Sequence, residues 1–341
     1  MKKIVCAGNG IVDIIKRIDE YPQKGMLSKI KSVSYGVGGS VCNTGITLKQ
    51  LAPQSLDVAA ATRIGRDDNG KFLKSVFAKY GINTERVIED DTLPTAFTDV
   101  MTTPNGERTF FSACGACSVF SETDLHTDTI DCDIFHIGYL LLLDALDQPD
   151  SQYGTKMAKL LAAVQARGIR TSIDVVSAEG SRFSEIVMPA LRYCDYVVIN
   201  EIEASRIAEI PLRDECGLLE ENLLPVCRKL RQAGVRKTVV VHCPELGCAL
   251  TEDGTFSIVP SLKLPDGYIV GSVGAGDAFG AGMLYSFAES MSAADGLRLA
   301  SCAAACNLRV ADSISGAKNL AETMALESKF ERLGEIRISR V

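Results

Sequence analysis

Histidine and tryptophan are almost absent from this sequence. Among 341 residues there are only three His, at positions 126, 136 and 242, and no Trp. So few imidazoles argue against a His-rich metal centre or a His-based catalytic triad. Basic residues are also in deficit, with 36 Lys and Arg against 43 Asp and Glu, and a formal net charge of −7 argues against a nucleic-acid groove as the main function. The composition, 46% hydrophobic and 23% charged, is that of a folded globular protein.

Long apolar runs free of glycine are also missing. The most apolar long stretch, residues 267–288, contains one Asp and six Gly, a pattern too interrupted for a membrane span. The apolar run that follows Met1 is too short for a signal peptide. We therefore expect a cytoplasmic protein with no membrane partner.

Cysteine is plentiful, but its spacing indicates no framework. The twelve cysteines are scattered, and the one C-x-x-C pair, Cys114 and Cys117, has no second pair at zinc spacing. A redox role for this pair would require a thioredoxin-like context, and it stays an alternative. We interpret the cysteines as reduced, mostly buried thiols.

Short β-branched runs alternate with helical patterns along the chain. Strands are predicted at residues 3–7, 57–61, 134–137, 170–174, 196–199 and 238–242, and helices at 43–51, 70–80, 151–167, 181–191 and 218–233. The alternation indicates βαβ units around a mostly parallel sheet covered on both faces. Residues 11–37 and 95–112 break the rhythm with strand-like segments, which we expect to form a small antiparallel lid. Residues 1–341 are thus predicted to be a single α/β domain.

The most informative motif is Gly274-Ala275-Gly276-Asp277, which lies in a glycine-rich turn before an apolar helical run. A helix that begins near Ala275 directs its free N–H groups and the positive end of its dipole into that turn, which suits a phosphate. Asp277 falls in the first helical turn, where we expect the dipole to keep its carboxylate ionised. Such a carboxylate can accept the proton of an attacking hydroxyl.

Other phosphate-binding patterns were compared with this motif. The chain has no G-x-x-x-x-G-K-[ST] and no H-R-D or D-F-G pair, so P-loop and protein-kinase sites are excluded. Gly8-Asn-Gly10 follows the first strand, but Asp13 stands where a dinucleotide fingerprint has its third glycine, and residues 21–56 contain no Asp or Glu to bind a ribose. An NAD-dependent oxidoreductase therefore remains only as a less favoured alternative.

Several motifs together resemble the ribokinase (pfkB) family of carbohydrate and nucleoside kinases, over roughly residues 3 to 320. Gly-Gly-Ser-Val-Cys-Asn at residues 38–43 resembles the family's N-terminal signature. Residues 200–203, Asn-Glu-Ile-Glu, match its N-x-x-E motif, and residues 274–277 match its C-terminal signature. The resemblance implies a ribokinase-like three-layer α/β/α fold with a mostly parallel central sheet and a small β-sheet lid.

The resemblance also implies roles for individual residues. The catalytic group would be Gly274, Ala275 and Gly276 as the anion hole and Asp277 as the general base. The acceptor would be bound by Asp13, Gly38, Gly39 and Asn43. The nucleotide would be bound by Asn200, Glu203, Gly247 and Asn307. Glu203 would also hold Mg²⁺, through water, because Mg²⁺ usually keeps several of its waters.

Four of the polar residues also fit a purely structural role. Glu203 could lie on a solvated helix face, and Asp13 could be a surface carboxylate. Asn43 could cap the helix that follows it, a position that Asn favours. Arg108 could reach the acceptor from the lid, but we favour a charge at the end of a hairpin.

Two positions depart from the family's pattern. Gly271-Ser272 stands where the family usually has Asp-Thr, and since that Asp helps to hold a monovalent cation, potassium activation is in doubt. In His242-Cys-Pro-Glu-Leu-Gly247, Pro244 replaces the first glycine of the nucleotide loop, removing a backbone donor. These departures motivate an alternative, a non-catalytic ligand-binding or regulatory protein on the same fold.

The favoured interpretation is an ATP-dependent kinase, a phosphotransferase with an alcohol group as acceptor. It would transfer the γ-phosphoryl group to a hydroxyl of a sugar, sugar acid or nucleoside, with ATP and Mg²⁺ as cofactors. The sequence does not select among these acceptors. The edge strands of a lid are often paired or covered, which predicts a homodimer through the lid.

Overall fold

The computed structural model of the chain describes residues 1–177 and 182–334. At its centre is one nine-stranded sheet. In chain order its strands are β1 (Lys2–Gly8), β4 (Leu56–Gly65), β5 (Asn83–Asp90), β8 (Ile134–Leu140), β11 (Arg170–Val175), β12 (Tyr196–Asn200), β15 (Thr238–His242), β16 (Leu246–Thr251) and β17 (Phe256–Pro260). The spatial order is β17-β16-β15-β12-β11-β8-β1-β4-β5, and only β16 and β17, at one edge, run antiparallel to their neighbours.

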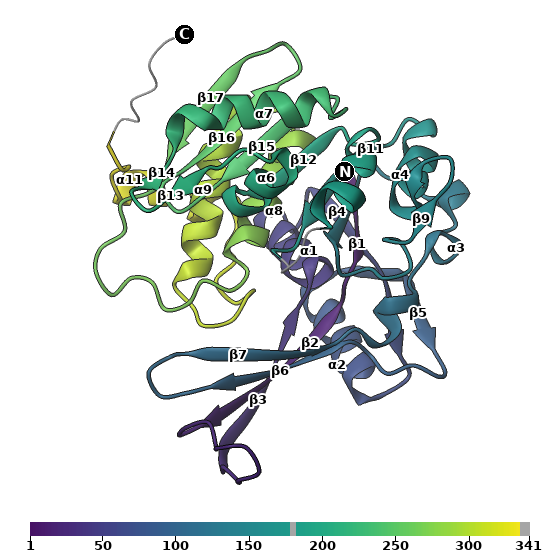
Figure 1. The fold of residues 1–341 in the computed structure, drawn as a ribbon, viewed down its shortest axis with the longest axis vertical. Helices are drawn as coiled ribbons and strands as arrows, with labels where there is room; N and C mark the ends of the chain where they lie inside the picture. Colours follow the sequence, from purple (N-terminus) through teal and green to yellow (C-terminus); the bar gives the residue numbers. More distant parts are fainter. Residues whose placement is uncertain (178–181, 335–341) are drawn as a thin grey trace.

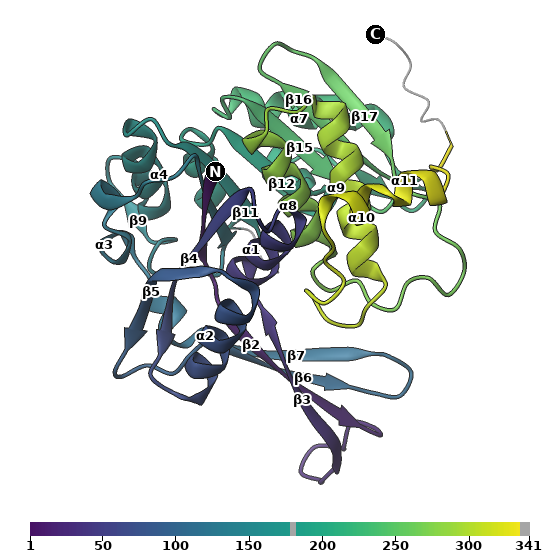
Figure 2. The same ribbon diagram turned by 180° about the vertical axis from the view of Figure 1, so that it is seen from behind.

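Helices cover both faces of this sheet (Figures 1 and 2). One face carries α1 (Ser40–Leu51), α2 (Asp68–Tyr80), α8 (Ala275–Ala288) and α9 (Ala293–Leu308), and the other carries α4 (Lys156–Ala166), α5 (Phe183–Leu191), α6 (Glu201–Ala208) and α7 (Leu223–Gln232). Short helices are α3 (Glu122–Leu125), α10 (Leu320–Met324) and α11 (Leu326–Lys329). Short paired strands are β9 (Pro149–Asp150) with β10 (Gly154–Thr155), and β13 (Arg213–Asp214) with β14 (Gly217–Leu218).

The residues of β1 show why the buried strands are continuous apolar runs. Ile4 and Cys6 pack into the core beneath α1 and α8, whereas Val5 and Ala7 pack into the core beneath α4, α5 and α7. Successive side chains of a strand point to opposite faces, so a strand covered on both faces must be apolar throughout. All six predicted strands are present, and the predicted three-layer arrangement is confirmed.

Three predicted helices begin later than expected. The helix predicted at 151–167 begins at Lys156, because Thr155 caps it by accepting from the N–H of Ala158 and the preceding residues pair as β9 and β10. The helix predicted at 218–233 begins at Leu223, which leaves Pro225 in the first turn, where its missing N–H is tolerated. The helix predicted at 181–191 begins at Phe183, and residue 181 lies outside the described residues.

The predicted lid is a second sheet that projects from the body of the molecule (Figures 1 and 2). Its strands are β2 (Ile11–Ile18), β3 (Ile30–Gly38), β6 (Phe97–Thr102) and β7 (Arg108–Ala113), in the order β3-β2-β6-β7. The expectation of a fully antiparallel lid is wrong at one point. Two antiparallel hairpins are present, but β2 pairs in parallel with β6, because both hairpins leave the body in the same direction.

No helix among residues 1–177 and 182–334 is long and apolar enough to cross a membrane. This agrees with the glycine-punctuated character of residues 267–288, most of which form the turn before α8 and α8 itself.

Candidate active site

The glycine turn at which the sequence predicts a phosphate site is present before α8. Gly274 is the N-cap residue of α8 and has φ 77°, and a Cβ there would lie 2.7 Å from the Cβ of Ser313. Both facts require glycine at this position. Ala275 and Gly276 follow in the first turn, where helix N–H groups have no partner within the helix, although the N–H of Ala275 donates to the carbonyl of Ser272 at 3.2 Å.

Asp277 lies in the same turn and is only 8% exposed. Its carboxylate accepts three side-chain hydrogen bonds. Oδ1 accepts from Tyr139 Oη at 2.6 Å and from Thr44 Oγ1 at 3.3 Å, and Oδ2 accepts from Asn43 Nδ2 at 3.0 Å. Oδ2 therefore retains the capacity to accept a further hydrogen bond.

The pKa of Asp277 shifts in the direction opposite to the one that the helix dipole alone would produce. Burial raises the pKa of this carboxyl above its ordinary value, while the hydrogen bonds from Tyr139, Asn43 and Thr44 oppose that rise. Removal from water thus outweighs the position at the helix N-terminus. A carboxylate with a raised pKa is a better proton acceptor than a fully solvated one.

Asn43 is not the helix cap that it could have been. The N-cap residue of α1 is Gly39, and the N–H of Asn43 donates to the Gly39 carbonyl at 3.0 Å, so Asn43 lies inside the first turns of the helix. Its Nδ2 contacts Asp277, and its Oδ1 is buried with no partner in the described part of the chain. Gly39 has φ 82°, and a Cβ there would lie 2.3 Å from the carbonyl oxygen of Asn9.

Asp13 faces the same region from the lid. It lies on β2 opposite Gly36, and a Cβ on Gly38 would lie 2.8 Å from Asp13 Oδ2, so Gly38 leaves room for the carboxylate. Burial raises the pKa of Asp13 to about 6, and the positive charge of Arg108 opposes this rise. The thiol of Cys42 has its pKa raised by burial and also by the charges of Asp13 and Asp277, so both carboxylates lie near one buried side chain.

Asn200 and Glu203 form a capping box at the start of α6. Asn200 Oδ1 accepts from the N–H of Glu203 at 2.9 Å, and the N–H of Asn200 donates to Glu203 Oε2 at 3.0 Å. Glu203 Oε1 also accepts from Ser177 Oγ at 2.7 Å and from Asn200 Nδ2 at 2.8 Å. Glu203 is therefore buried, 3% exposed, and not on a solvated helix face.

The side chains around Glu203 fit a Mg²⁺ ion that is bound through its water molecules and not by direct protein ligands. No cluster of three or more His, Cys, Asp or Glu able to hold a metal occurs among the described residues. Both oxygens of Glu203 already accept hydrogen bonds, and burial, together with the charge of Asp277, raises the pKa of its carboxyl to about 7. Such a carboxylate suits a magnesium ion that keeps its waters and takes its direct ligands from phosphate oxygens.

A cavity of about 550 Å³ opens beside the glycine turn that precedes α8. Its lining includes Gly276, Ile202, His242, Pro244, Phe279 and Leu308. The His242 ring stacks on Phe279 with centroids 4.6 Å apart, and burial lowers the pKa of His242 to about 4, so the imidazole is neutral near pH 7. A flat apolar cavity wall next to a phosphate site suits a nucleotide base.

Two residues expected to bind the nucleotide lie behind this cavity instead of lining it. Gly247 is inside β16, where a Cβ would lie 2.8 Å from Cζ of Phe279. Asn307 is buried on α9, and its Nδ2 donates to the carbonyl of Val273 at 2.7 Å, which fixes the turn before α8. At Gly271 a Cβ would lie 2.8 Å from the carbonyl oxygen of Val310, so the family's larger residue would not fit here without movement.

Sequence reasoning missed Tyr139, Thr44 and Asp174. Tyr139 and Asp174 come at the carboxyl ends of β8 and β11, the edge at which parallel sheets bind ligands. Burial and the charges of Glu203 and Asp277 raise the pKa of Asp174 well above its ordinary value. Polar residues at or just after the ends of predicted strands would have been a usable signal for Tyr139 and Asp174.

Comparisons with known proteins agree with this geometry. Residues 1–319 match the model of the pfkB family of carbohydrate kinases. The chain is 28% identical over 283 residues to the 2-dehydro-3-deoxygluconokinase of Dickeya dadantii (78% of this chain, 83% of that protein) and 26% identical over 313 residues to a ribokinase of Arabidopsis thaliana (91% and 77%).

Solved structures show the same fold. A ribokinase from Thermotoga maritima superposes with a TM-score of 0.77 at 20% identity, covering 96% of this chain and all of that one. The Arabidopsis thaliana ribokinase complexed with ribose and ATP gives 0.77 at 20% identity, covering 96% and 99%. Family membership sets aside the oxidoreductase alternative. The chain belongs to the pfkB family of carbohydrate kinases, ATP-using phosphotransferases with an alcohol group as acceptor.

Proposed function

We propose that this sugar kinase transfers the γ-phosphoryl group of ATP to a hydroxyl of a sugar, sugar acid or nucleoside, with Asp277 as the general base. The observation that carries the proposal is the buried Asp277 carboxylate beside the glycine turn, with one oxygen, Oδ2, able to accept a further hydrogen bond. The whole chain acts as one kinase unit with the lid as part of it.

Different residues bind the acceptor, accept its proton and stabilise the transferred phosphoryl group. The acceptor hydroxyl hydrogen-bonds to Asp277 Oδ2, and as its oxygen bonds to the γ-phosphorus, the proton passes to Asp277 and the bond to ADP breaks. The N–H of Gly276, and that of Ala275 once it leaves the Ser272 carbonyl, stabilise the negative charge on the transferring group. The Asp13 carboxylate and Asn43 Oδ1 accept hydrogen bonds from other hydroxyls of the acceptor. Gly38 and Gly39 have no side chain and so leave space for the acceptor beside the backbone.

The nucleotide lies with its base in the cavity beside His242 and Phe279 and its phosphates at the α8 turn. Asn307 supports that turn from behind, and Gly247 leaves space for Phe279. Asn200 and Glu203 would hold Mg²⁺ through water. When bound, Mg²⁺ supplies charge neutralisation on the phosphate oxygens.

Closure of the lid over the acceptor would exclude water and limit ATP hydrolysis. Apolar side chains on the lid are left exposed, among them Val33 at 49%, Tyr35 at 59% and Phe111 at 58%. These support the proposal of a homodimer through the lid. Sedimentation of wild type and Phe111→Ser tests it, and a wild-type monomer at micromolar concentration would overturn it.

The cytoplasm remains the proposed location. All twelve cysteines are free thiols, which suits a reducing compartment.

The experiment that tests the proposed function is a coupled ADP-release screen over sugars, sugar acids and nucleosides, with and without K⁺. Acceptor-dependent ADP release is expected, with no requirement for K⁺. ATP binding without turnover of any acceptor would favour the non-catalytic alternative, which the replacements at Pro244 and Gly271 motivate.

A further inference from the structure

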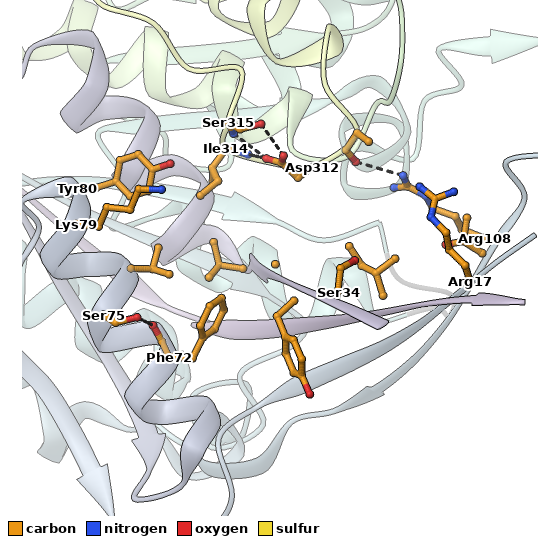
Figure 3. A pocket seen from close by; sticks show the side chains of 17 residues that line it. Arg17, Ser34, Phe72, Ser75, Lys79, Tyr80, Arg108, Asp312, Ile314 and Ser315 are labelled. Atoms are coloured by element: carbon orange, nitrogen blue, oxygen red, sulfur yellow. Dashed lines mark hydrogen bonds between the residues drawn. The ribbon is translucent and has the colours of Figure 1, made fainter. Parts of the chain in front are cut away.

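A second cavity, of about 530 Å³, lies beneath the lid and is not used by the mechanism above. It is bounded by the lid strands, by α2 and by the loop of residues 311–315, and we call it the lid cavity (Figure 3). The residues considered below are Arg17, Gly36, Lys79, Thr102, Arg108 and Asp312, all of which line it.

The charges of the lid cavity oppose the charge of the chain. In a protein of net charge −7, its lining carries three cations, Arg17, Lys79 and Arg108, and one carboxylate, Asp312. That carboxylate is already engaged, because Asp312 Oδ1 accepts from the N–H groups of Ile314 and Ser315 at 2.9 and 2.7 Å. The cavity is therefore a local positive site, which attracts anions.

The cations are largely free to bind a ligand. The Arg17 side chain has no hydrogen bond or ion pair with any residue that the structure describes, and Lys79 lies over the Tyr80 ring at 5.0 Å. Arg108 donates one hydrogen bond, from Nη2 to the carbonyl of Ala311 at 3.2 Å, and keeps its other N–H donors. Figure 3 shows Arg17 and Arg108 together at one side of the cavity and Lys79 at the opposite side.

Strand register explains why the two arginines meet. Thr102 of β6 is paired with Arg17 of β2 on one side and with Arg108 of β7 on the other. Residues paired across neighbouring strands point to the same face, and strands lie about 4.8 Å apart, so the two arginine backbones are about 10 Å apart with Thr102 between them. Two guanidinium groups at that spacing can converge on one carboxylate or phosphate.

Thr102 provides an independent indication of a ligand. It is 7% exposed, and its hydroxyl is buried without a hydrogen-bond partner in the described part of the chain. Buried polar groups are normally paired, so an orphaned hydroxyl between two arginines calls for a partner. The oxygen of a bound anion would be that partner.

The lid cavity continues from the acceptor site. Arg17 is four residues after Asp13 on β2, so both point to the same face, about 13 Å apart along the strand. Gly36, which lines the cavity, is paired with Asp13, and a Cβ on Gly36 would lie 3.8 Å from the Asp13 Cβ. The Arg17 side chain is long enough to cover part of this distance, so one elongated acceptor can contact Asp13 at one end and the arginines at the other.

We propose that the row Arg17–Thr102–Arg108 binds a carboxylate or phosphate at the end of the acceptor remote from the phosphorylated hydroxyl. The acceptor is thus an anionic sugar derivative and not a neutral sugar or nucleoside. This inference rests on the proposed kinase function and narrows its substrate class.

The test compares acceptors in the ADP-release assay on the full chain. Neutral sugars (ribose, fructose) are set beside sugar acids (gluconate, 2-dehydro-3-deoxygluconate) and monophosphorylated sugars (ribose 5-phosphate, fructose 6-phosphate). We expect kcat/KM to be higher for an anionic acceptor, and the acid and phosphate arms identify which anion is bound. Its KM should rise with ionic strength, because exposed charges are screened by salt.

Substitutions in the lid cavity test whether it is the site that binds the anionic group. Arg17→Gln should lower kcat/KM for the anionic acceptor about 10- to 100-fold, the usual effect of losing a hydrogen bond to a charged group, with little change for a neutral acceptor. Thr102→Val removes only the unpartnered hydroxyl, so the fold should keep its melting temperature while KM for the anionic acceptor rises. Lys31→Gln, which removes an exposed lid cation paired with Asp19, is the matched control and should change neither.

The outcomes separate the two proposals. If a neutral sugar is phosphorylated best and Arg17→Gln leaves its kinetics unchanged, the proposal of an anionic acceptor is wrong, whereas the proposed kinase function still holds. If no acceptor is phosphorylated, the proposed function itself fails. An anionic preference that Arg17→Gln and Thr102→Val both leave intact would place the anion elsewhere and overturn the assignment to the lid cavity.

Discussion

The hydroxyl of Tyr139 donates a 2.6 Å hydrogen bond to Oδ1 of Asp277 across 138 positions of the chain. The tyrosine is itself held in place, because its N–H donates to Asn9 Oδ1 at 2.8 Å and Asn9 Nδ2 donates to the carbonyl of Leu142 at 3.0 Å. The proposed base is thus oriented by residues from β8, α1 and the turn after β1. Asn9 and Tyr139 would act through Asp277 as positioning residues.

The first prediction concerns Tyr139→Phe. Loss of the hydroxyl removes a donor that lowers the pKa of Asp277, so that pKa rises further. A base must be deprotonated to act, and kcat/KM therefore falls on acidification at a higher pH in the variant than in wild type. The measurement is the pH profile of kcat/KM for the acceptor.

Tyr153→Phe, in the turn between β9 and β10 where its ring packs against Tyr193, is the control for this profile and should leave its acidic limb in place. A Tyr139→Phe profile that superposes on wild type would show that the hydrogen bond has no influence on the base.

The second prediction concerns Asp277→Asn. The amide keeps the size of the side chain but cannot accept the hydroxyl proton, so kcat should fall at least about 10²- to 10⁴-fold. ATP affinity, measured by calorimetry, should be nearly unchanged, because the glycine turn and the nucleotide cavity are not altered. Turnover close to wild type would eliminate Asp277 as the base.

The features that could be predicted from the sequence are those set by local residue patterns. β-Branched runs predicted the six parallel strands, and the glycines before α8 predicted the phosphate-binding turn. Asn43, however, fits both a helix cap and a site residue from sequence alone, and only the position of Gly39 as the N-cap residue decides between them. The sequence also could not show whether Glu203 is buried or exposed. Its burial depends on hydrogen bonds from Ser177 and Asn200, and the charged residues of its helical turn do not indicate them.

The rest depends on contacts between distant segments. Tyr139 contacts Asp277 only because the fold brings the end of β8 and the start of α8 to the same edge of the sheet. The row of Arg17, Thr102 and Arg108 depends on β2 pairing in parallel with β6, which no local pattern specified. The upward shift in the pKa of Asp277 could not be predicted for a similar reason, because the desolvation of that carboxyl comes from tertiary packing.

The third prediction concerns Asp13→Asn. Burial raises the pKa of Asp13 to about 6 from an ordinary value of 3.8, so the folded state holds a proton that the unfolded state has lost. Between these values the contribution of Asp13 to stability falls as the pH rises. Asp13→Asn removes this cost, so its melting temperature should exceed that of wild type at pH 8 and match it near pH 4.

The same variant should bind its acceptor less well at pH 8, with a raised KM, because an ionised carboxylate accepts hydroxyl hydrogen bonds better than an amide. Asp19→Asn, at the exposed end of the lid, is the control for both measurements. A melting temperature for Asp13→Asn below that of wild type at pH 8 would contradict the buried, destabilising carboxylate.

The last prediction concerns Gly247→Ala, which separates direct contact with the nucleotide from support of the cavity wall. The added methyl would lie 2.8 Å from Cζ of Phe279 and 3.1 Å from Cδ2 of Leu297, so the Phe279 ring must shift. Overpacking of this kind costs about 1–3 kcal/mol of stability. Because Phe279 also lines the nucleotide cavity, KM for ATP should rise while KM for the acceptor stays constant.

Gly280→Ala is the matched control, since nothing lies within 4 Å of a Cβ at this position in α8 and alanine favours the helix. It should leave both KM values unchanged without loss of stability. If Gly247→Ala lowers the melting temperature but leaves KM for ATP unchanged, Phe279 does not border the bound nucleotide. If it changes neither the melting temperature nor KM for ATP, the close packing of Gly247 against Phe279 is itself wrong.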